Sequence, residues 1–289
     1  MKTILIIGIN GFLGSHIAKS FKDDFKIIGL ASNTNNLFRI NNEKFEVLSS
    51  SDKEIARVFE NNTIDIIIYA ATKYKSSSKN LFSLFNTNVI LPFKLLELSK
   101  QHNIKSFINV DTFFNNPKYS YSYLSDYTLS KKHLLDWLKI FSTTCSFKIV
   151  NMKIFHMYGE GDSTSKFIPS MIEKISNNEP FLNLTKGEQK RDFIYIEDVV
   201  EAFRTVIMSI NTLDNFQEFE VGTGSSTSIQ DLLVAIKKMF NSSTELIFGS
   251  LEYRKNEIMI SKANNSELLK LGWVVKHDIN QGIKKLIKS

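Results

Sequence analysis

The fold is decided by the stretch Ile4-Leu5-Ile6-Ile7-Gly8-Ile9-Asn10-Gly11-Phe12-Leu13-Gly14, after which a helical pattern begins at Ser15. An apolar run that turns through glycines into a helix is typical of the first unit of a dinucleotide-binding sheet. Gly8 permits the tight turn, Gly11 lets backbone amides approach a pyrophosphate, and Gly14 lets the helix pack close to the strand. The pyrophosphate would lie at the positive end of the helix. We therefore expect cofactor contacts from Gly8, Asn10, Gly11, Phe12, Leu13 and Gly14.

A secretory signal is the alternative interpretation of this stretch, since Lys2 precedes the apolar run. Its apolar core of about seven residues is at the bottom of the range for signal peptides, and no small-x-small cleavage site follows. No later run approaches the roughly 20 apolar residues of a membrane span. We expect a soluble, cytoplasmic protein with no membrane partner.

The composition is that of a folded globular protein. The chain has 289 residues, of which 43% are hydrophobic, enough for a full core. Its single cysteine, Cys145, excludes an internal disulfide framework. The net charge of +6 comes from scattered lysines without the basic run that follows a nucleic acid backbone, so no nucleic-acid partner is expected. The five histidines include no pair at metal-ligand spacing, and no metal site is predicted.

Strand and helix patterns alternate along the first half of the chain. Apolar runs without alternation are strands buried on both faces, as in parallel sheets. This order predicts an α/β fold with a doubly wound parallel sheet. We expect a Rossmann domain over residues 1–160, re-entered by about 190–225, and a mainly substrate-binding cap over 161–289. The predicted strands are 4–7, 26–30, 64–70, 106–110, 147–154, 193–196 and 219–221, and the helices begin at Ser15 and span 53–60, 87–101, 126–141, 198–208 and 229–240.

Tyr127 and Lys131 are the strongest candidates for chemistry. They are four residues apart at the start of a predicted helix, preceded by the possible caps Ser125 and Asp126, so they share one face. A cation about 4 Å from a phenol, at an effective dielectric of 20, contributes roughly 4 kcal/mol, or about three pKa units. We therefore expect Tyr127 to exchange a proton near neutral pH, as a carbonyl reductase requires. A surface pair without function is the alternative.

Two further residues bear on this interpretation. Thr112 follows the strand 106–110, at the carboxyl edge where open sheets bind ligands, and its hydroxyl could hold a substrate carbonyl oxygen. Tyr69 and Lys73 share the Tyr–Lys spacing, but they fall at a strand end, where residues four apart lie about 13 Å from each other. Only Tyr127 has both the lysine and a helix to present it.

Motifs along nearly the whole chain resemble the extended short-chain dehydrogenases/reductases of the nucleotide-sugar type. Three more stretches resemble a narrower group in that family, reductases acting on the keto group at carbon 4 of a CDP-linked deoxyhexose. Besides the glycine loop and the Tyr127/Lys131 pair, the family motifs are Ile67-Ile68-Tyr69-Ala70-Ala71, Asn88-Val89, His156-Met157-Tyr158-Gly159-Glu160-Gly161, Arg191-Asp192-Phe193-Ile194-Tyr195 and Leu271-Gly272-Trp273; the narrower ones are 109–114, 187–193 and 256–259.

The resemblance implies a role for each matching residue. Tyr127 would be the acid, Lys131 would bind the nicotinamide ribose, and Thr112 would anchor the sugar oxygen. His156 stands where many members carry an asparagine that faces the nucleotide sugar. Arg191 and Arg254 match positions that contact the nucleotide and its diphosphate, which guanidinium groups bind bidentately. The implied sets are Ala70, Ala71 and Asn88 for the cofactor, with Thr72, Thr112, His156, Arg191 and Arg254 for the substrate.

Two features separate the possible cofactors and reactions. An NAD site favours an acidic residue about 20 positions past the glycine loop. This chain has Ser32 and Asn33 there, with Arg39 nearby, which favours NADP(H) and leaves NAD(H) open. Family members that eliminate water carry an acidic pair directly after the active-site threonine, whereas this chain has Phe113-Phe114.

The sequence therefore predicts an NADPH-dependent reductase of the 4-keto group of a nucleotide-linked (CDP- or dTDP-) 6-deoxy or 3,6-dideoxy hexose, in the biosynthesis of a surface polysaccharide. The alternatives are a nucleotide-sugar 4-epimerase with tightly bound NAD and a non-catalytic dinucleotide-binding regulator. The short loop Asn115–Tyr123 and the lysine at position 153, where arginine is frequent, depart from the family pattern. Relatives pair the helices 87–101 and 126–141 in a dimer seam, so we expect a homodimer.

Overall fold

The computed structural model describes residues 1–74, 80–119 and 124–288, and the chain separates into two compact units. Unit 1 comprises Met1–Asn115, Tyr123–Lys153 and Phe203–Phe219. Unit 2 comprises Asn116–Ser122, Ile154–Ala202 and Glu220–Ser289. The first part of unit 1 ends at Lys153, whereas residue 160 was expected. The chain returns to unit 1 over Phe203–Phe219, a shorter stretch than the expected 190–225.

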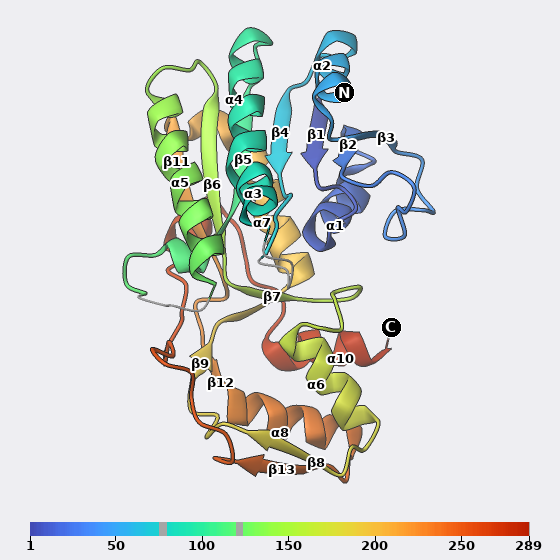
Figure 1. Ribbon diagram of the computed structural model, residues 1–289, viewed down its shortest axis with the longest axis vertical. Coiled ribbons are helices and arrows are strands. Elements are labelled where there is room, and N and C mark those ends of the chain that lie inside the picture. Colours follow the sequence, from blue (N-terminus) through green and yellow to red (C-terminus); the bar gives the residue numbers. More distant parts are fainter. Residues whose placement is uncertain (75–79, 120–123, 289) are drawn as a thin grey trace. The chain divides into compact units, whose positions relative to one another are not determined.

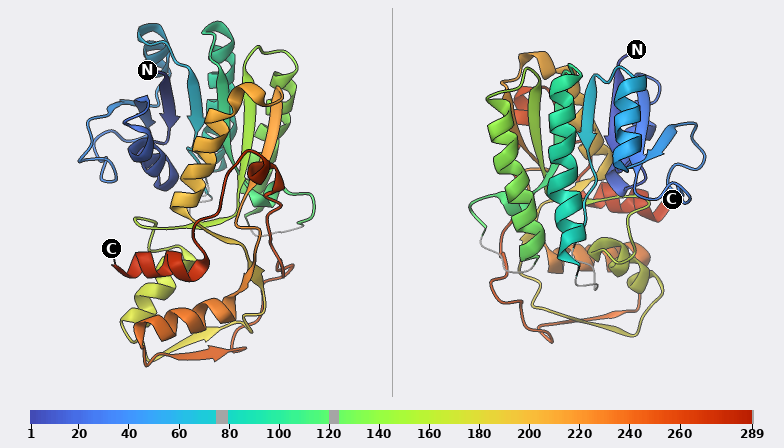
Figure 2. Two further views of the ribbon diagram at one scale, coloured as in Figure 1. Left: turned by 180° about the vertical axis from the view of Figure 1, so that it is seen from behind. Right: turned by 45° about the horizontal axis from the view of Figure 1, so that its top comes forward.

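Unit 1 is built on a seven-stranded parallel sheet in the order β11-β6-β5-β4-β1-β2-β3. The order reverses direction at β1, as in doubly wound folds, so the α/β prediction is confirmed. One face of the sheet is covered by α2 (Asp52–Asn61), α4 (Leu91–Gln101) and α5 (Ser125–Ser142), and the other by α1 (Phe12–Phe21) and the end of α7 (Ile196–Met208), as Figures 1 and 2 show. The strands are β1 (Thr3–Ile7), β2 (Lys26–Ala31), β3 (Glu46–Ser49), β4 (Ile66–Tyr69), β5 (Ser106–Thr112), β6 (Lys148–Ile154) and β11 (Phe216–Val221).

The central strands are apolar because both of their faces are covered. Every residue of β1 and of β4 is buried, and β1 pairs in parallel with both β2 and β4. The carboxyl ends of these strands therefore share one edge of the sheet, where ligands bind in open α/β folds. The helices of this unit are α1 (Phe12–Phe21), α2 (Asp52–Asn61), α3 (Leu81–Phe85), η1 (Asn86–Ile90), α4 (Leu91–Gln101), η2 (Phe113–Asn115), α5 (Ser125–Ser142) and η3 (Ile210–Thr212).

The helix predicted over 87–101 begins earlier and is irregular. The α-helix α3 passes through a π-helical turn, η1, into α4. The continuous stretch Leu81–Gln101 is long and apolar enough to cross a membrane by length and composition, contrary to the expectation that no run comes close to this. A single helix of this kind is weak evidence of a membrane span, and its Lys94 forms an ion pair with Asp52 of α2 at 2.8 Å.

Unit 2 consists of short strand pairs and helices. Its strands pair as β10 with β7, β12 with β9 and β13 with β8. The predicted strand 193–196 is therefore part of a small separate pair, and only β11 of the two later predicted strands joins the main sheet. The elements are β7 (His156–Tyr158), α6 (Phe167–Ser176), β8 (Phe181–Leu184), β9 (Lys190–Arg191), β10 (Phe193–Tyr195), α7 (Ile196–Met208), β12 (Thr227–Ser228), α8 (Ile229–Phe240), β13 (Glu245–Phe248), α9 (Ser266–Lys270) and α10 (Ile279–Lys288).

A buried carboxylate organises the connections between the small strands of unit 2. Asp192 lies between β9 and β10 and is fully buried. Its oxygens accept hydrogen bonds from the N–H of Thr223, Gly224 and Ala263 and from the Thr223 hydroxyl, at 2.7 to 3.0 Å. These bonds join loops that are distant in sequence, and they give Asp192 of the Arg191-Asp192-Phe193 motif a structural role.

Candidate functional site

The glycine loop between β1 and α1 is shaped by close backbone contacts. Gly8 has φ +84°, and a Cβ there would lie 2.8 Å from the amide nitrogen of Ala71. A Cβ on Gly14 would collide with the carbonyl oxygen of Gly8. The amide of Gly11 donates to that same oxygen at 2.8 Å, and α1 begins at the next residue, Phe12. The loop therefore needs small residues to bring the amino terminus of α1 to the strand edge.

Asn10 connects this loop to the chain that follows β2. Its side chain donates to the carbonyl of Asn36 at 2.9 Å and accepts from the amide of Arg39 at 3.1 Å. The Arg39 guanidinium lies 3.3 Å from the carbonyl oxygen of Asn10 and 4.4 Å from the ring centre of Phe38. Arg39 is thus held beside the glycine loop. Ser32 and Asn33 are exposed just beyond the end of β2.

The end of β4 carries Ala70, Ala71 and the exposed Thr72. The amide of Ala70 donates to Ile7 at 3.0 Å, which places this segment beside the glycine loop. Asn88 is fully buried, and its amide donates to the carbonyl of Lys73 and to the Ser130 hydroxyl, both at 2.9 Å. Asn88 therefore fixes the chain after β4 against α5. From the sequence, Asn88 was expected to contact the cofactor, and this positioning role was not predicted.

Tyr127 and Thr112 meet at the edge of the sheet. Tyr127 is in the first turn of α5 and only 5% exposed, and its phenol is hydrogen-bonded to the Thr112 side chain at the end of β5. Tyr74 packs against it with ring centres 4.6 Å apart. The helix is not capped as expected: Leu124, with φ +63°, is the N-cap residue, and Ser125 is already helical.

Lys131 lies one turn further along α5 and is 1% exposed. Its ammonium donates to the carbonyl of Val110 at 2.8 Å. Burial lowers the pKa of Lys131 to about 8, while the nearby negative charge of Asp111 acts to raise it. The Tyr–Lys pair is therefore buried, and the alternative of a surface pair is wrong.

The expectation that Tyr127 exchanges a proton near neutral pH was wrong. Burial raises the pKa of Tyr127 well above 10, and the neighbouring Tyr74 and Asp111 raise it further. The physical reason is that a buried phenolate loses its hydration, and the Asp111 carboxylate offsets the field of the lysine. Tyr127 is thus a neutral O–H group at physiological pH, which suits a proton donor rather than a base.

Sequence reasoning missed two members of this cluster. Asp111, which directly precedes Thr112 in the sequence, is 3% exposed. Its negative charge acts to raise the pKa of Lys131. A charged residue at the end of an otherwise buried strand was the signal that could have identified it. Tyr74 gave no such signal, because its contact with Tyr127 depends on the path of the chain after β4.

His156 belongs to unit 2, where it starts β7. Its Nε2 lies 3.2 Å from the hydroxyl of Ser261, and its ring packs near Phe193. Burial, and then the positive charge of Arg191, lower the pKa of His156 to about 3. The imidazole is therefore neutral and can both donate and accept a hydrogen bond.

Arg191 and Arg254 also belong to unit 2. The guanidinium of Arg191 forms an ion pair with Glu257 and donates to the carbonyl of Ile258. Arg254 is exposed three residues before Glu257 in the same segment. The structure thus brings together the predicted cofactor and catalytic residues in unit 1, while His156, Arg191 and Arg254 lie in unit 2. Among the described residues, no group of three or more His, Cys, Asp or Glu side chains could hold a metal ion.

Curated relatives match the chain over nearly its full length. It is 33% identical to CDP-abequose synthase of Salmonella typhimurium over 99% of this chain and 97% of that protein. It is 35% identical to CDP-abequose synthase of Salmonella muenchen with the same coverage. Both identities lie above the level at which two full-length chains share a family.

Solved structures share the fold. UDP-glucose 4-epimerase of Thermotoga maritima superposes with a TM-score of 0.85 at 22% identity, covering 99% of this chain and 97% of that one. dTDP-glucose 4,6-dehydratase of Bacillus anthracis, solved in complex with NAD, gives 0.82 at 17% identity, covering 100% and 96%. The profile of the NAD dependent epimerase/dehydratase family matches residues 4–222. The chain therefore belongs to the NAD dependent epimerase/dehydratase family and is an enzyme of that family.

Proposed function

We propose that this protein reduces the 4-keto group of a CDP- or dTDP-linked 6-deoxy or 3,6-dideoxy hexose with NADPH, in the biosynthesis of a surface-polysaccharide sugar. The single observation that carries the proposal is the buried cluster of Thr112, Tyr127 and Lys131 at the carboxyl edge of the sheet. CDP-abequose synthases similar over the full chain support a reduction at carbon 4 rather than another reaction of the family.

The glycine loop fits a dinucleotide. Its close contacts at Gly8 and Gly14 leave no room for side chains between the strand and α1, so the first amides of α1 are available to a pyrophosphate. Phe12 and Leu13 open that helix, Ala70 and Ala71 follow the adjoining strand β4, and the buried Asn88 holds the chain after them in place for the cofactor. Reduced nicotinamide would supply the hydride when the cofactor is bound. Arg39, held beside Asn10, supports NADPH over NADH because a guanidinium pairs with a 2′-phosphate.

In the proposed reaction, the chain positions the sugar and delivers a proton. Thr112 holds the carbonyl oxygen and Tyr127 donates its phenolic proton to that oxygen as negative charge develops. A phenol is a far stronger acid than an alcohol, so the transfer is downhill even though burial raises the pKa of Tyr127. Lys131, as an ammonium, stabilises the phenolate left behind and binds the nicotinamide ribose. In unit 2, Arg191 and Arg254 would bind the diphosphate and His156 the sugar, and Thr72 would extend the site after β4.

Elimination of water is disfavoured by the residues after Thr112. Phe113 and Phe114 pack against each other with ring centres 4.1 Å apart, so the chain has aromatic rings where dehydration needs carboxyl groups. An epimerase remains the second candidate, because UDP-glucose 4-epimerase shares the fold. An epimerase returns the hydride and consumes no cofactor, which separates the two reactions in one assay.

Tyr127→Phe tests the proposal directly. The variant keeps the ring but loses the proton donor, so we expect turnover of a CDP- or dTDP-linked 4-ketosugar to fall by a factor of about 10²–10⁴. NADPH binding, followed by fluorescence titration, should be unchanged. Oxidation of NADPH at 340 nm and NMR of the sugar product measure the reaction.

The matched control is Tyr69→Phe, since Tyr69 has the same spacing to Lys73. The Tyr69 hydroxyl donates to the carbonyl of Thr87 rather than to Thr112, so it is not the proposed proton donor and turnover should stay within a few-fold of the wild type. Full turnover by Tyr127→Phe would contradict the assignment. Tightly held NAD with no net NADPH oxidation would instead favour the epimerase.

A further inference from the structure

Asp111 is a buried carboxylate for which the proposed reaction has no role yet. It lies at the end of β5 and three donors surround it. The amide of Asn151 donates to Oδ2 at 2.8 Å, and the amide of Asn115 contacts both oxygens at 2.9 and 3.0 Å. The N–H of Thr112 donates to Oδ1 at 2.8 Å. Burial raises the pKa of Asp111, and the charge of Lys131 together with these hydrogen bonds acts against it, because they fix the orientation of the carboxylate and favour its ionised form.

The polar contacts continue away from Asp111 into β6 and β11. Asn151 is fully buried and also donates to Glu218 at 3.0 Å, and Lys153 forms an ion pair with Glu218 at 2.8 Å. The side-chain amide of Asn109 donates to Asn151 at 2.7 Å, but the side-chain oxygen Oδ1 of Asn109 is buried without a hydrogen-bond partner in the described part of the chain. Apolar side chains in these positions would stabilise the fold more than such a cluster does, since one unsatisfied buried acceptor costs about 1–3 kcal/mol of folding free energy. Stability alone therefore does not account for it, and polar clusters of this kind are typical of functional sites.

The group that gains from Asp111 is Lys131. Burial favours the neutral amine, and the opposing influence is the charge of Asp111. A neutral Lys131 could neither stabilise a phenolate nor keep its full attraction for a ribose hydroxyl. The ammonium is held in place by the carbonyl of Val110, the residue next to Asp111 in β5.

Resting on the proposed function, we propose that Asp111 is a further positioning residue of the site, whose carboxylate, fixed by Asn115 and Asn151, is the counter-charge that keeps Lys131 an ammonium beside Tyr127. It acts through Lys131 and does not touch the substrate. In the described part of the chain, the titratable groups that face the pair include the phenols of Tyr127 and Tyr74, with Glu218 and its partners Lys153 and Lys139 beyond Asn151.

The test follows the charge of Lys131 directly, without substrate. The full chain is labelled with ¹³C-lysine, and Lys131→Met identifies the Lys131 signal by its loss. We expect the wild-type signal to titrate near pH 8. In Asp111→Asn the midpoint should fall by about one pH unit or more, the shift that loss of an opposite buried charge causes. The control is Asp136→Asn, which removes an exposed carboxylate from the same helix and should leave the midpoint unchanged.

A reciprocal measurement covers the case in which Asp111→Asn does not fold. Lys131→Met places an apolar chain in the same buried position, and the carboxyl signal of Asp111 should then titrate at higher pH than in the wild type. An unchanged Lys131 midpoint in a folded Asp111→Asn, or an unchanged Asp111 midpoint in Lys131→Met, would overturn the proposal.

Activity then separates this inference from the function itself. If the protein is a ketoreductase, the alkaline limb of the pH profile of kcat should move to lower pH in Asp111→Asn, because the neutral amine forms earlier. Shifted midpoints without turnover of any 4-ketosugar would contradict the proposed function while leaving the Asp111–Lys131 coupling established.

Discussion

At the scale of single residues, burial changes the chemistry that spacing suggests. Tyr127 and Lys131 are four residues apart on one helix face, and spacing alone predicts that the ammonium lowers the pKa of the phenol. In the structure both side chains are almost fully buried, and Asp111 adds a negative charge beside them. The phenol therefore stays protonated. Burial, with smaller contributions from Tyr74 and Asp111, thus decides that Tyr127 starts as an acid rather than as a base.

Arg39 allows a prediction about the cofactor at this scale. Arg39→Ala removes a guanidinium beside the glycine loop, and a hydrogen bond to a charged group contributes about 1.5–3 kcal/mol. We expect the KM for NADPH to rise about 10-fold to 100-fold, while the KM for NADH changes little. Steady-state kinetics with both cofactors measure the effect. The control is Arg57→Ala, which removes an exposed arginine of α2 and should change neither value. Equal losses with both cofactors would argue against recognition of a 2′-phosphate.

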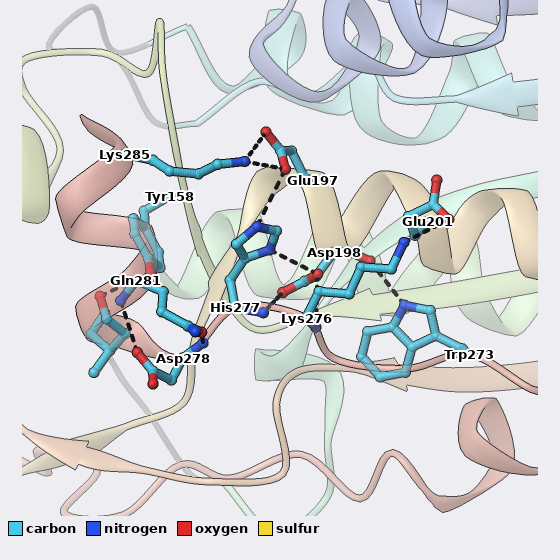
Figure 3. A network of polar contacts seen from close by, with 11 residues as sticks. Tyr158, Glu197, Asp198, Glu201, Trp273, Lys276, His277, Asp278, Gln281 and Lys285 are labelled. Atoms are coloured by element: carbon cyan, nitrogen blue, oxygen red, sulfur yellow. Dashed lines mark hydrogen bonds and ion pairs between the residues drawn. The ribbon is translucent and has the colours of Figure 1, made fainter. Parts of the chain in front are cut away.

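At the scale of elements, the first turn of α7 holds the segment that leads into α10. Asp198 is fully buried in unit 2. Its carboxylate accepts from the amides of Lys276 and His277 at 3.1 and 3.0 Å and lies 3.1 Å from Nδ1 of His277. Its carbonyl oxygen accepts from the indole of Trp273 at 3.0 Å (Figure 3). Four contacts to one residue explain how a segment without regular structure is fixed before α10.

Asp198→Asn tests this attachment. An asparagine offers one acceptor oxygen and turns a donor toward the backbone N–H groups, so at least one of them stays unpaired. We expect a loss of about 1–3 kcal/mol in the free energy of unfolding and faster hydrogen exchange over 273–288. The control is Glu201→Gln on the same helix, which changes a partly exposed side chain paired with Lys276 at 3.7 Å and should cost less than about 1 kcal/mol. Equal effects of the two changes would show that Asp198 does not hold the segment.

At the scale of the whole molecule, unit 1 exposes apolar side chains on α3 and α5. Leu129, Trp137 and Ile140 fall on one face of α5, and each is at least 41% exposed. Phe82 and Phe85 of α3 are also exposed, and Phe85 contacts His133 of α5 edge to face. An apolar face shared by neighbouring helices is typical of a protein interface. Together with the apolar stretch Leu81–Gln101, this supports our proposal that the enzyme is a homodimer through these helices.

Ile140→Glu should weaken that dimer. The residue is 54% exposed, so the change leaves the core intact but places a charge in the proposed interface. Analytical ultracentrifugation should show a dimer for the wild type and a shift toward monomer for the variant. Lys19→Glu, exposed on α1 at the other face of the sheet, is the control and should remain dimeric. A wild-type protein that is monomeric at high concentration would contradict the proposal.

The sequence by itself determined the layered α/β fold, because unbroken apolar runs such as Ile4–Ile7 can be satisfied only between two layers of helices. It also determined the glycine loop and the pairing of Tyr127 with Lys131, since spacing along one helix is local. Only the tertiary structure decided which groups surround that cluster. Asp111 meets Asn151 across 40 residues and Tyr74 meets Tyr127 across the sheet edge, and no local pattern encodes such contacts. The pKa values follow from those neighbours and from burial, so they too belong to the folded chain rather than to its sequence.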